Sequence, residues 1–419
     1  MPTLEAARQA LRSTFGFEDF RPGQGAIIEA VLAGADVLAV MPTGSGKSLC
    51  YQLPALMRAG LTVVVSPLIA LMRNQVAQLR SYGVAAASLN SHNDVAENRQ
   101  ITERLERGAL RMVYVSPERL AQPDTLALLK RASVGLLAVD EAHCVSQWGH
   151  AFRPEYLALG AAQAALGAQT VACTATADCA TRADILARLF RRTPKVFVQG
   201  FDRPNLRLRT RAKSSKTSGR AQVMDFVRDH LGQSGIVCCR SRRKSEAIAE
   251  FLRQGGVNAR PYHVGLEPAS RSRHQDMFLH QDGVVIVATI AFGLGIDKPD
   301  VRFVLHADLP ANIESYYHEI GRAGRDGLPA DTLTLYERDD IWLRRMQIEQ
   351  GQAANEQKRI DHRRLDALVS LCESAYCRRL FLLDYFGEAA QPCGNCDICL
   401  DARQRWSRRW WGALLCRSR

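Results

Sequence analysis

Apolar and polar positions alternate in a regular way along the first two hundred residues. Short runs of β-branched and aliphatic residues are separated by stretches in which apolar residues recur at helical spacing. Buried strands separated by amphipathic helices are typical of a mostly parallel sheet covered on both faces. The predicted strands are DVLAVMP (36–42), LTVVVSP (61–67), RMVYVSP (111–117), VGLLAVDEAH (134–143) and QTVACTAT (169–176).

A second series of predicted strands follows a polar, basic stretch. That stretch, RLRTRAKSSKTSGR (207–220), has few apolar residues, and we interpret it as a linker or surface crossing. The pattern therefore predicts two α/β lobes joined by a hinge. The strands expected in the second lobe are SGIVCCRS (234–241), NARPYHVG (258–265), VVIVAT (284–289), VRFVLHAD (301–308) and DTLTLY (331–336).

A third, helical region begins near residue 341, where IWLRRMQIEQ and LDALVSLCE supply apolar faces, and it ends in a cysteine cluster. The final segment, from residue 402, holds three of the five tryptophans, six arginines and no acidic residue. It is too short to form another domain. The predicted organisation is a first lobe at 1–206, a second at 207–340, a cysteine-rich module at 341–402 and a basic tail at 403–419.

The composition narrows the class of protein. With 47% hydrophobic and 23% charged residues, the chain is expected to be globular. Neither a bilayer-spanning run nor a signal peptide is evident, so we expect a cytoplasmic protein that has no membrane partner and associates with the nucleoid if it binds DNA. A formal charge of +12 favours polyanionic partners, although many basic proteins bind no nucleic acid.

The twelve cysteines of a cytosolic chain are not expected to form disulfides. Eight of them have no ligand-like grouping, and most of these are expected to be small buried or half-buried residues. They are Cys50, Cys144, Cys173, Cys179, Cys238, Cys239, Cys372 and Cys416.

The segment MPTGSGKS (41–48) lies between a predicted strand and a predicted helix, as a phosphate-binding loop requires. Glycines let the backbone turn its N–H groups toward phosphate oxygens, Lys47 can reach the β- and γ-phosphates, and the Ser48 hydroxyl can bind Mg²⁺. The alternative is a Gly/Ser-rich turn with an incidental lysine. The predicted nucleotide-contacting residues are Thr43, Gly44, Ser45, Gly46, Lys47 and Ser48.

Two carboxylates end the predicted strand GLLAVDEAH. Asp140 is placed to hold Mg²⁺, and Glu141 to orient and deprotonate an attacking water. Carboxylates at a strand end can also be surface caps, but a phosphate loop some ninety residues earlier favours the catalytic interpretation.

Two arginines in IGRAGRDG (320–327), Arg322 and Arg325, are spaced three apart, which predicts that they share one face of a helix. In a two-lobed ATPase they would act as arginine fingers that stabilise the transition state. In isolation, a solvated basic turn would explain them equally well.

Taken in order, these segments resemble superfamily 2 helicases and specifically the RecQ family. The helicase series is MPTGSGKS, SPLIALMRNQV, SPERL, DEAH, TATAD, ATIAFGLGIDKPD and HEIGRAGRDG. The segment FGFEDFRPGQ (15–24) resembles the family's adenine-recognition motif, which implies that Phe17 stacks on the base while Arg21 and Gln24 bond its edge. The resemblance implies two tandem RecA-like lobes and a small helical zinc-binding module.

A second family-specific stretch, DEAHCVSQWGHAFRPEY (140–156), resembles the aromatic-rich loop that couples single-stranded DNA to hydrolysis. Aromatic side chains stack on unpaired bases at about 1–3 kcal/mol per base, and arginine adds phosphate contacts. Ordinary packing under a loop is the alternative for its aromatics. Asp297, in ATIAFGLGIDKPD, is expected to contact nucleotide and help relay its state. The predicted DNA-binding and coupling residues are His143, Gln147, Trp148, His150, Phe152 and Arg153.

The cysteine cluster CGNCDIC places Cys393, Cys396 and Cys399 at a spacing that can surround a tetrahedral ion. The resemblance of SAYCRRLFLLDYFGE to the RecQ zinc-binding region implies Cys377 as the fourth Zn²⁺ ligand. Cys372 competes for that role, but it lies in an apolar pattern and is expected in the core. Four sulfur ligands imply a structural zinc ion.

The chain departs from the family pattern at two places. His318 stands where family members usually carry glutamine, so we expect altered nucleotide contacts without loss of function. The family's winged-helix domain does not follow the cysteine module, and we expect either a truncation or frame shift, a short isoform, or a basic tail (403–419) that grips nucleic acid itself.

The resemblance implies an ATP-dependent 3′-to-5′ DNA helicase of DNA repair and recombination. Its expected cofactors are ATP, Mg²⁺ between Ser48 and Asp140, and Zn²⁺. Its expected partners are single-stranded and partly duplex DNA, with single-strand-binding protein and recombination factors. The alternatives are a translocase without efficient unwinding, an RNA helicase, and a catalytically weak DNA-binding remnant.

Overall fold

The computed structural model describes residues 2–67, 69–91, 93–146, 153–214, 219–289 and 298–401. The chain divides into two compact units, residues 1–200 and 201–419. In the described part of the chain, no helix has the length and apolar character needed to cross a membrane.

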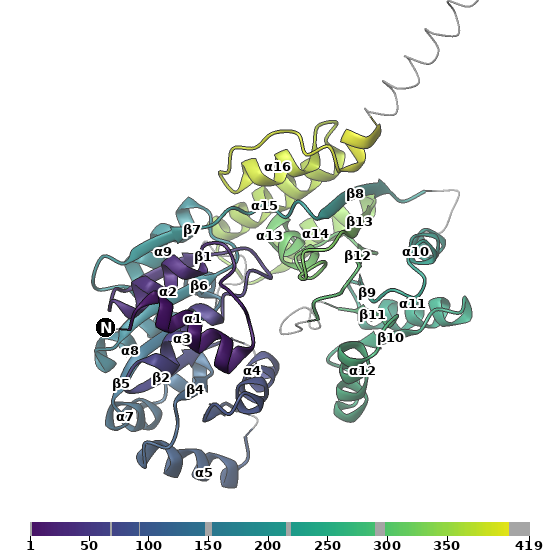
Figure 1. Ribbon diagram of the computed structural model, residues 1–419. Helices are drawn as coiled ribbons and strands as arrows, with labels where there is room; N and C mark the ends of the chain where they lie inside the picture. The colour runs from purple at the N-terminus through teal and green to yellow at the C-terminus, as the bar shows by residue number, and fades with distance from the viewer. Residues whose placement is uncertain are drawn as a thin grey trace, which may run out of the picture. The chain divides into compact units, whose positions relative to one another are not determined.

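The described residues of the first unit contain one parallel sheet with strand order β3-β4-β2-β5-β6-β1-β7 (Figure 1). Every residue of β1 to β4 is buried, so helices cover both faces of the sheet. The strands are β1 (Val37–Val40), β2 (Leu61–Val65), β3 (Ala86–Leu89), β4 (Met112–Val115), β5 (Val134–Val139), β6 (Gln169–Thr174) and β7 (Lys195–Val198).

Apart from three helical segments that precede β1, the helices of the first unit lie between strands in sequence, and together they cover the sheet. Alternate strand residues such as Val37 and Ala39 pack in one apolar cluster with residues of α1, α2 and α3. The helices are α1 (Leu4–Ala10), η1 (Leu11–Phe15), α2 (Gln24–Leu32), α3 (Leu49–Met57), α4 (Ile69–Ser81), α5 (Val95–Glu106), α6 (Pro117–Leu120), α7 (Pro123–Arg131), η2 (Ala142–Val145), η3 (Pro154–Ala158), α8 (Leu159–Leu166) and α9 (Cys179–Leu189).

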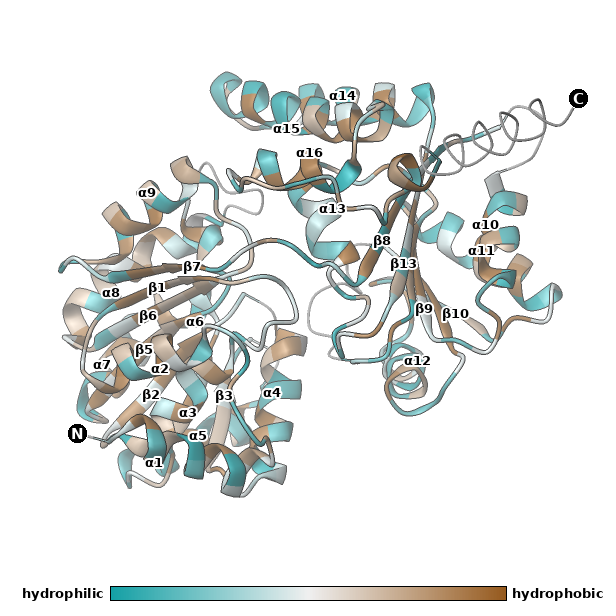
Figure 2. Cartoon of the chain, turned by 45° about the horizontal axis from the view of Figure 1, so that its top comes forward, coloured by the Kyte–Doolittle hydropathy of each residue, from teal (hydrophilic) through white to brown (hydrophobic). Residues whose placement is uncertain are grey.

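A second parallel sheet, with strand order β10-β11-β9-β12-β13-β8, forms the centre of the second unit. The hydropathy colouring of Figure 2 shows its strands as largely apolar, with mixed helices outside them. The strands are β8 (Leu206–Ala212), β9 (Gly235–Cys238), β10 (Ala259–Tyr262), β11 (Val285–Ala288), β12 (Phe303–His306) and β13 (Ala330–Tyr336).

The helices after β13 form the third region that the sequence predicts. Helices α14 and α15 carry the two predicted apolar patterns, and α16 begins directly after Cys377. The helices of this unit are α10 (Gly219–Arg228), α11 (Arg242–Gln254), α12 (Pro268–His280), α13 (Ile313–Ile320), α14 (Arg338–Gln350), α15 (Asn355–Glu373) and α16 (Arg378–Tyr385).

All of the strands predicted from the sequence are present, and two tandem α/β lobes are confirmed. The interpretation of 207–220 as a linker is wrong for its first part, because residues 207–212 belong to β8 and pair with β13 along its whole length. Three strands, β3, β7 and β8, were not predicted.

Candidate functional site

The predicted phosphate loop joins β1 to α3 at the carboxyl edge of the first sheet. Gly44 and Gly46 have φ of 84° and 79°, the left-handed conformation that glycine adopts without steric cost. The Lys47 ammonium lies 3.4 Å from the carbonyl oxygens of both Met41 and Pro42. It is therefore held over the loop by weak contacts that an incoming anion can replace.

Arg21 and Gln24, predicted to bond an adenine edge, contact the phosphate loop in this structure. The Gln24 amide donates to the carbonyl oxygens of Ser45 at 2.9 Å and Gly46 at 3.0 Å, and its oxygen accepts from the Arg21 N–H at 2.9 Å. The Arg21 guanidinium donates to the Gly44 carbonyl. The predicted base-recognition segment and the phosphate loop are thus joined by hydrogen bonds. Phe17, the predicted stacking residue, is 51% exposed.

Asp140 lies at the end of β5 with only 5% of its surface exposed. Burial, followed by the nearby charge of Glu141, raises the pKa of Asp140 to about 7, although the Lys47 ammonium acts in the opposite direction. The carboxylate charge is therefore incompletely compensated by Lys47. A cation bound beside Asp140 would stabilise its negative charge.

Glu141 has a φ of 49°, which is unusual for a residue with a side chain. Its Oε2 lies 3.3 Å from Nδ1 of the buried His143, and the same Nδ1 lies 2.9 Å from the hydroxyl of Thr174 in β6. Backbone strain of this kind persists where the surroundings impose it, as they do at functional sites. The structure thus brings together the DEAH and TATAD segments through His143.

The described part of the chain includes only the two ends of the aromatic-rich loop. Gln147, Trp148, His150 and Phe152 lie outside the described residues, and so does Asp297 of the second unit. Arg153 is described, and its guanidinium donates to the Pro67 carbonyl at 3.1 Å and lies 3.9 Å from Glu118.

The prediction that Arg322 and Arg325 lie on one face of a helix is wrong. Helix α13 ends at Ile320, and the two arginines follow in a series of turns. Gly321 caps the helix, and Gly324 and Gly327, with φ of 56° and 85°, keep the segment after it in turns. Arg322 is 8% exposed.

Two residues that the sequence analysis did not identify hold this turn. The Arg203 guanidinium donates to the carbonyl oxygens of Gly321, Ala323 and Gly324 at 2.8–3.3 Å. The Asn205 amide donates to those of Gly324 and Leu328 at 2.9 Å each. No local pattern marks these residues, because the turn they bind lies more than a hundred residues away in the sequence.

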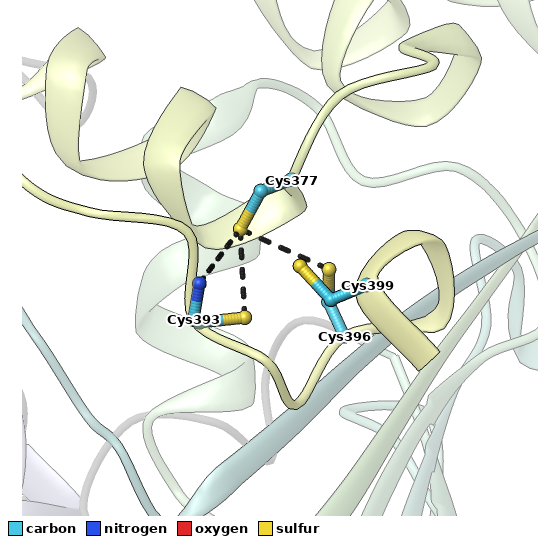
Figure 3. Close-up of side chains that lie close together, drawn as sticks. All are labelled: Cys377, Cys393, Cys396 and Cys399. Atoms are coloured by element: carbon cyan, nitrogen blue, oxygen red, sulfur yellow. Dashed lines mark hydrogen bonds between the residues drawn. The ribbon is translucent and has the colours of Figure 1, made fainter. Parts of the chain in front are cut away.

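The four predicted zinc ligands gather at the start of α16 (Figure 3). The sulfur atoms of Cys377, Cys393, Cys396 and Cys399 all lie within 4.8 Å of one another. Cys372 is buried and does not belong to the cluster, as expected.

The spacing of the sulfur atoms fits a tetrahedral zinc ion. Zn–S bonds of about 2.3 Å place sulfurs roughly 3.8 Å apart, and the sulfur of Cys377 lies 3.5 Å from that of Cys393 and 3.9 Å from that of Cys396. Burial raises the pKa of the Cys377 thiol, but hydrogen bonds from the backbone N–H groups of Cys393 and Leu380 and from the neighbouring thiols outweigh it and lower the pKa to about 7. A thiolate, the form that binds metal, is thus accessible at neutral pH.

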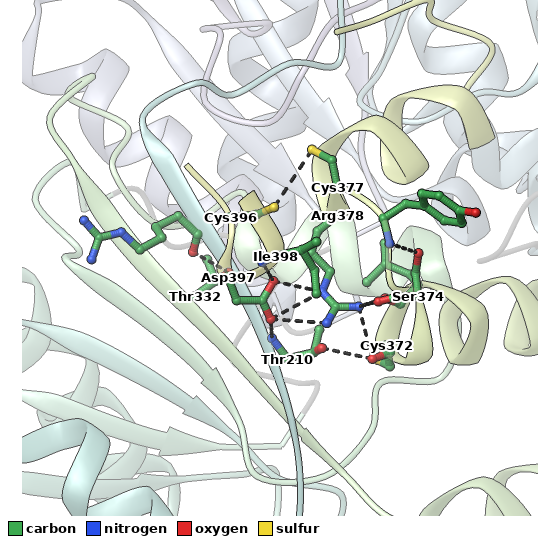
Figure 4. A network of polar contacts seen from close by, with 12 residues as sticks. Thr210, Thr332, Cys372, Ser374, Cys377, Arg378, Cys396, Asp397 and Ile398 are labelled. Carbon is green, nitrogen blue, oxygen red and sulfur yellow. Dashed lines mark hydrogen bonds and ion pairs between the residues drawn. The ribbon is translucent and has the colours of Figure 1, made fainter. Parts of the chain in front are cut away.

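The loop between the cysteines is tied to the second sheet through Asp397 (Figure 4). Its carboxylate accepts from the Arg378 Nε at 3.0 Å and from the backbone N–H of Thr210, in β8, at 3.0 Å. The Thr210 hydroxyl donates to the carbonyl of Cys372 at 3.0 Å. The cysteine module therefore packs as part of the second unit.

Three family models match successive parts of the chain. They are described as DEAD/DEAH box helicase (residues 21–185), helicase conserved C-terminal domain (residues 219–327) and RecQ zinc-binding (residues 338–400).

Several named relatives align along almost the whole chain. The ATP-dependent DNA helicase RecQ of Pasteurella multocida is 47% identical over 409 residues, which cover 97% of this chain and 64% of that protein. The ATP-dependent DNA helicase RecQ of Bacillus subtilis is 41% identical over 408 residues, which cover 96% of this chain and 68% of that protein. The chain therefore spans about two thirds of the length of these relatives.

Solved structures with a similar fold are more distant in sequence. The helicase Lhr of Mycobacterium smegmatis, bound to ssDNA and AMP-PNP, has a TM-score of 0.64 at 19% identity, with 87% of this chain and 57% of that chain covered. The DUF1998 helicase MrfA, bound to DNA and AMPPNP, has a TM-score of 0.67 at 17% identity, with 97% and 60% covered. They support the two-lobed fold, and the relatives and family models together show that the chain belongs to the RecQ family of superfamily 2 helicases.

Proposed function

We propose that this chain is an ATP-dependent DNA helicase motor that moves 3′ to 5′ along single-stranded DNA. Curated RecQ relatives are named ATP-dependent DNA helicases. We propose partly duplex DNA as the substrate. We also propose that the chain acts in DNA repair and recombination, as the resemblance to its family implies.

One observation carries the proposal: a lysine on a glycine loop and a buried carboxylate lie at the carboxyl ends of two strands, one on each side of β6. Strands β1 and β5 both flank β6, and Lys47 is close enough to Asp140 to lower its pKa against the effect of burial. A cationic clamp, a carboxylate for the metal and a neighbouring base are the parts that phosphoryl transfer requires.

In the proposed site the loop residues bind the nucleotide. The backbone N–H groups that Gly44 and Gly46 present would bind phosphate oxygens, and Lys47 would exchange its contacts with Met41 and Pro42 for the β- and γ-phosphates. Phe17 would stack on the adenine from its exposed position. Through Arg21 and Gln24, bonded to the loop, base recognition and phosphate binding would reinforce each other.

Asp140 and Ser48 would hold Mg²⁺, which neutralises charge on the phosphates when it is bound. Ser48 already accepts a hydrogen bond from the Gln75 amide at 2.9 Å, which leaves lone-pair capacity on its oxygen. Glu141 would orient water and accept its proton, and His143 would steady that carboxylate from 3.3 Å.

Arg322 and Arg325 would serve as arginine fingers that stabilise charge on the γ-phosphate. Arg203 and Asn205 support this role, since they hold the backbone of the turn that carries both arginines. Preorganised donors contribute because they need not rearrange during the reaction.

Cys377, Cys393, Cys396 and Cys399 would bind a structural Zn²⁺ ion. With four sulfur ligands the ion has no open position, so it would stabilise the module without taking part in hydrolysis.

Strand separation on matched duplexes tests the proposal. The substrates are one DNA duplex with a 3′ overhang, one with a 5′ overhang, and an RNA duplex with a 3′ overhang, each with ATP and Mg²⁺. We expect unwinding of the 3′-tailed DNA only, and none by Lys47→Ala. Unwinding of the RNA duplex in preference to DNA would contradict the DNA assignment, and unwinding from the 5′ overhang would contradict the polarity.

A related outcome would revise the proposal. If DNA stimulates ATP hydrolysis by the chain but no duplex is separated, the chain is a translocase without strand-separating activity. If the chain is a catalytically weak DNA-binding remnant, we expect no ATP hydrolysis at all. The same assay therefore distinguishes a remnant from a motor.

A further inference from the structure

A group of polar side chains joins helix α4 to the phosphate loop of the first unit. Gln75, in α4, donates from its amide nitrogen to the Ser48 hydroxyl at 2.9 Å. Tyr51 lies one turn after Ser48, in α3, and its hydroxyl donates to the Gln75 amide oxygen at 3.3 Å. Ser48 is predicted to hold Mg²⁺ with Asp140. Gln75 therefore contacts a predicted metal ligand from a different helix.

The sequence gives Gln75 no such role. It lies in SPLIALMRNQV (66–76), which belongs to the helicase series, but none of the predicted site residues comes from that segment. Gln75 and Ser48 are 27 residues apart, so no local pattern connects them. Their contact arises when α4 packs beside the start of α3.

Tyr51 fixes the orientation of the Gln75 amide. Its side chain is fully buried. Burial, followed by the nearby charge of Asp140, raises the pKa of Tyr51 well above its usual value, while a hydrogen bond with the Ser48 hydroxyl acts in the opposite direction. Tyr51 is therefore protonated at neutral pH and can donate to Gln75. A donor on the amide oxygen turns the amide NH₂ group toward Ser48.

These contacts leave one position free on the Ser48 oxygen. A hydroxyl oxygen has one proton and two lone pairs. The Gln75 amide occupies one lone pair, and the proton can point to the Tyr51 oxygen, so the second lone pair is left for a metal. The effect of the Asp140 charge on Tyr51 shows that this group lies near the carboxylate predicted to hold the same ion.

We propose that Gln75 is a positioning residue that orients the Ser48 hydroxyl for Mg²⁺ and thereby sets the affinity for magnesium-bound nucleotide. Groups that hydrogen-bond to a metal ligand hold it in its binding orientation, and their loss weakens metal binding. The inference rests on the proposed nucleotide site and adds a contribution from α4, which acts through Ser48 and not as a ligand.

Binding of a fluorescent, non-hydrolysable ATP analogue to the full chain, measured with Mg²⁺ and with EDTA, tests the proposal. Mg²⁺ should tighten binding to the parent protein. Gln75→Met keeps the length of the side chain but removes the amide. It should reduce that gain about three- to tenfold, as expected for one hydrogen bond, and leave the affinity in EDTA unchanged.

Gln78→Met is the matched control. Gln78 lies one turn further along α4, is exposed, and has its amide nitrogen 3.4 Å from the Tyr82 hydroxyl. This variant should bind the analogue as the parent does. If Gln75→Met does not fold, Tyr51→Phe provides a second test, because it removes the donor that orients the amide and should also reduce the gain from Mg²⁺.

A Ser48→Ala background shows whether Gln75 acts through the serine. There, Gln75→Met should change the gain from Mg²⁺ by less than about twofold, because the hydroxyl that it orients is gone. An equal loss in both backgrounds, or a loss as large in EDTA as in Mg²⁺, would overturn the proposal. An unchanged circular dichroism spectrum and melting temperature show that a variant is folded.

The positioning role and the helicase proposal fail in different ways, because nucleotide binding does not require hydrolysis. If Gln75→Met loses the gain from Mg²⁺ but DNA does not stimulate hydrolysis by the parent, only the helicase proposal fails. If Gln75→Met binds as the parent does, only the positioning role fails. A parent protein that does not bind magnesium-bound nucleotide would overturn both.

Discussion

Replacing Arg378 by alanine should destabilise the cysteine module strongly. Its guanidinium donates to both carboxylate oxygens of Asp397 and to the carbonyl oxygens of Leu371, Cys372 and Ser374, at 2.5–3.4 Å (Figure 4). Those carbonyls lie at the end of α15, where the helix supplies no N–H partners of its own. One side chain therefore satisfies a helix end and a buried carboxylate together.

The size of the expected loss in stability follows from how deeply the Arg378–Asp397 ion pair is buried. The Arg378 and Asp397 side chains are only 6% and 19% exposed. Removing one partner of a buried ion pair costs about 3–5 kcal/mol when the other is left without compensation. Because Asp397 keeps the hydrogen bonds from the backbone N–H groups of Thr210 and Ile398, we expect Arg378→Ala to cost about 3 kcal/mol, the lower end of that range. Arg345 and Asp366 form a control pair at 2.8 Å in the same helical region, with both side chains more than half exposed. Arg345→Ala should cost roughly 0.2–1 kcal/mol.

Release of zinc from the four-cysteine cluster during urea titration, followed with a chromogenic chelator, reports on the stability of this module. With a slope of about 1–3 kcal/mol per molar urea, the release midpoint should fall by roughly 1 M or more in Arg378→Ala. Arg345→Ala should shift it little. Equal shifts in the two variants would refute the reasoning, because they would show that burial of the pair does not determine its contribution.

Three further predictions concern other parts of the chain. Gly46→Ala should weaken ATP binding by about tenfold or more, since φ is 79° and a Cβ would lie 2.5 Å from the Gln24 amide nitrogen; nucleotide titration measures this. Arg203→Ala should lower kcat by about tenfold with little change in the KM for ATP, because it frees the arginine turn; steady-state kinetics separates the two constants. Burial would raise the pKa of Asp308, but its hydrogen bond from Lys244 and the surrounding charges lower it. The stability that Asp308 contributes is therefore present above its unfolded pKa of about 3.9 and is lost as pH falls through the lower folded value. The difference in unfolding free energy between the parent and Asp308→Asn should stay constant from about pH 7 to pH 5 and narrow below about pH 4.

The strands that sequence analysis found and missed differ in a physical way. Most of those found, such as β2 and β5, are largely buried and rich in β-branched or other aliphatic residues, which is the strongest signal for a buried strand. In contrast, β3 is AASL, of low strand propensity, and β7 is a largely exposed edge strand. Strand β8 alternates leucines with arginines at the other sheet's edge, where Leu206 and Leu208 are buried and Arg207 is exposed. Its polar face led to the interpretation as a linker.

The candidate site was predictable where its residues are close in sequence. The loop 41–48 and the pair at the end of β5 follow a strand directly, so their position could be read from local patterns. The contacts of Arg203 and Asn205 with the arginine turn arise only when segments far apart in the sequence come together in the fold. The spacing of Arg322 and Arg325 suggested a helix, but α13 ends at Ile320, and the spacing of two residues does not show where a helix ends.

ATP turnover with and without single-stranded DNA tests the central claim most directly. The account predicts Mg²⁺-dependent hydrolysis that is strongly stimulated by single-stranded DNA, stimulated less by RNA of the same length, and abolished in Lys47→Ala. Hydrolysis that does not respond to DNA, or that persists in Lys47→Ala, would contradict the claim that this chain is a DNA-coupled motor.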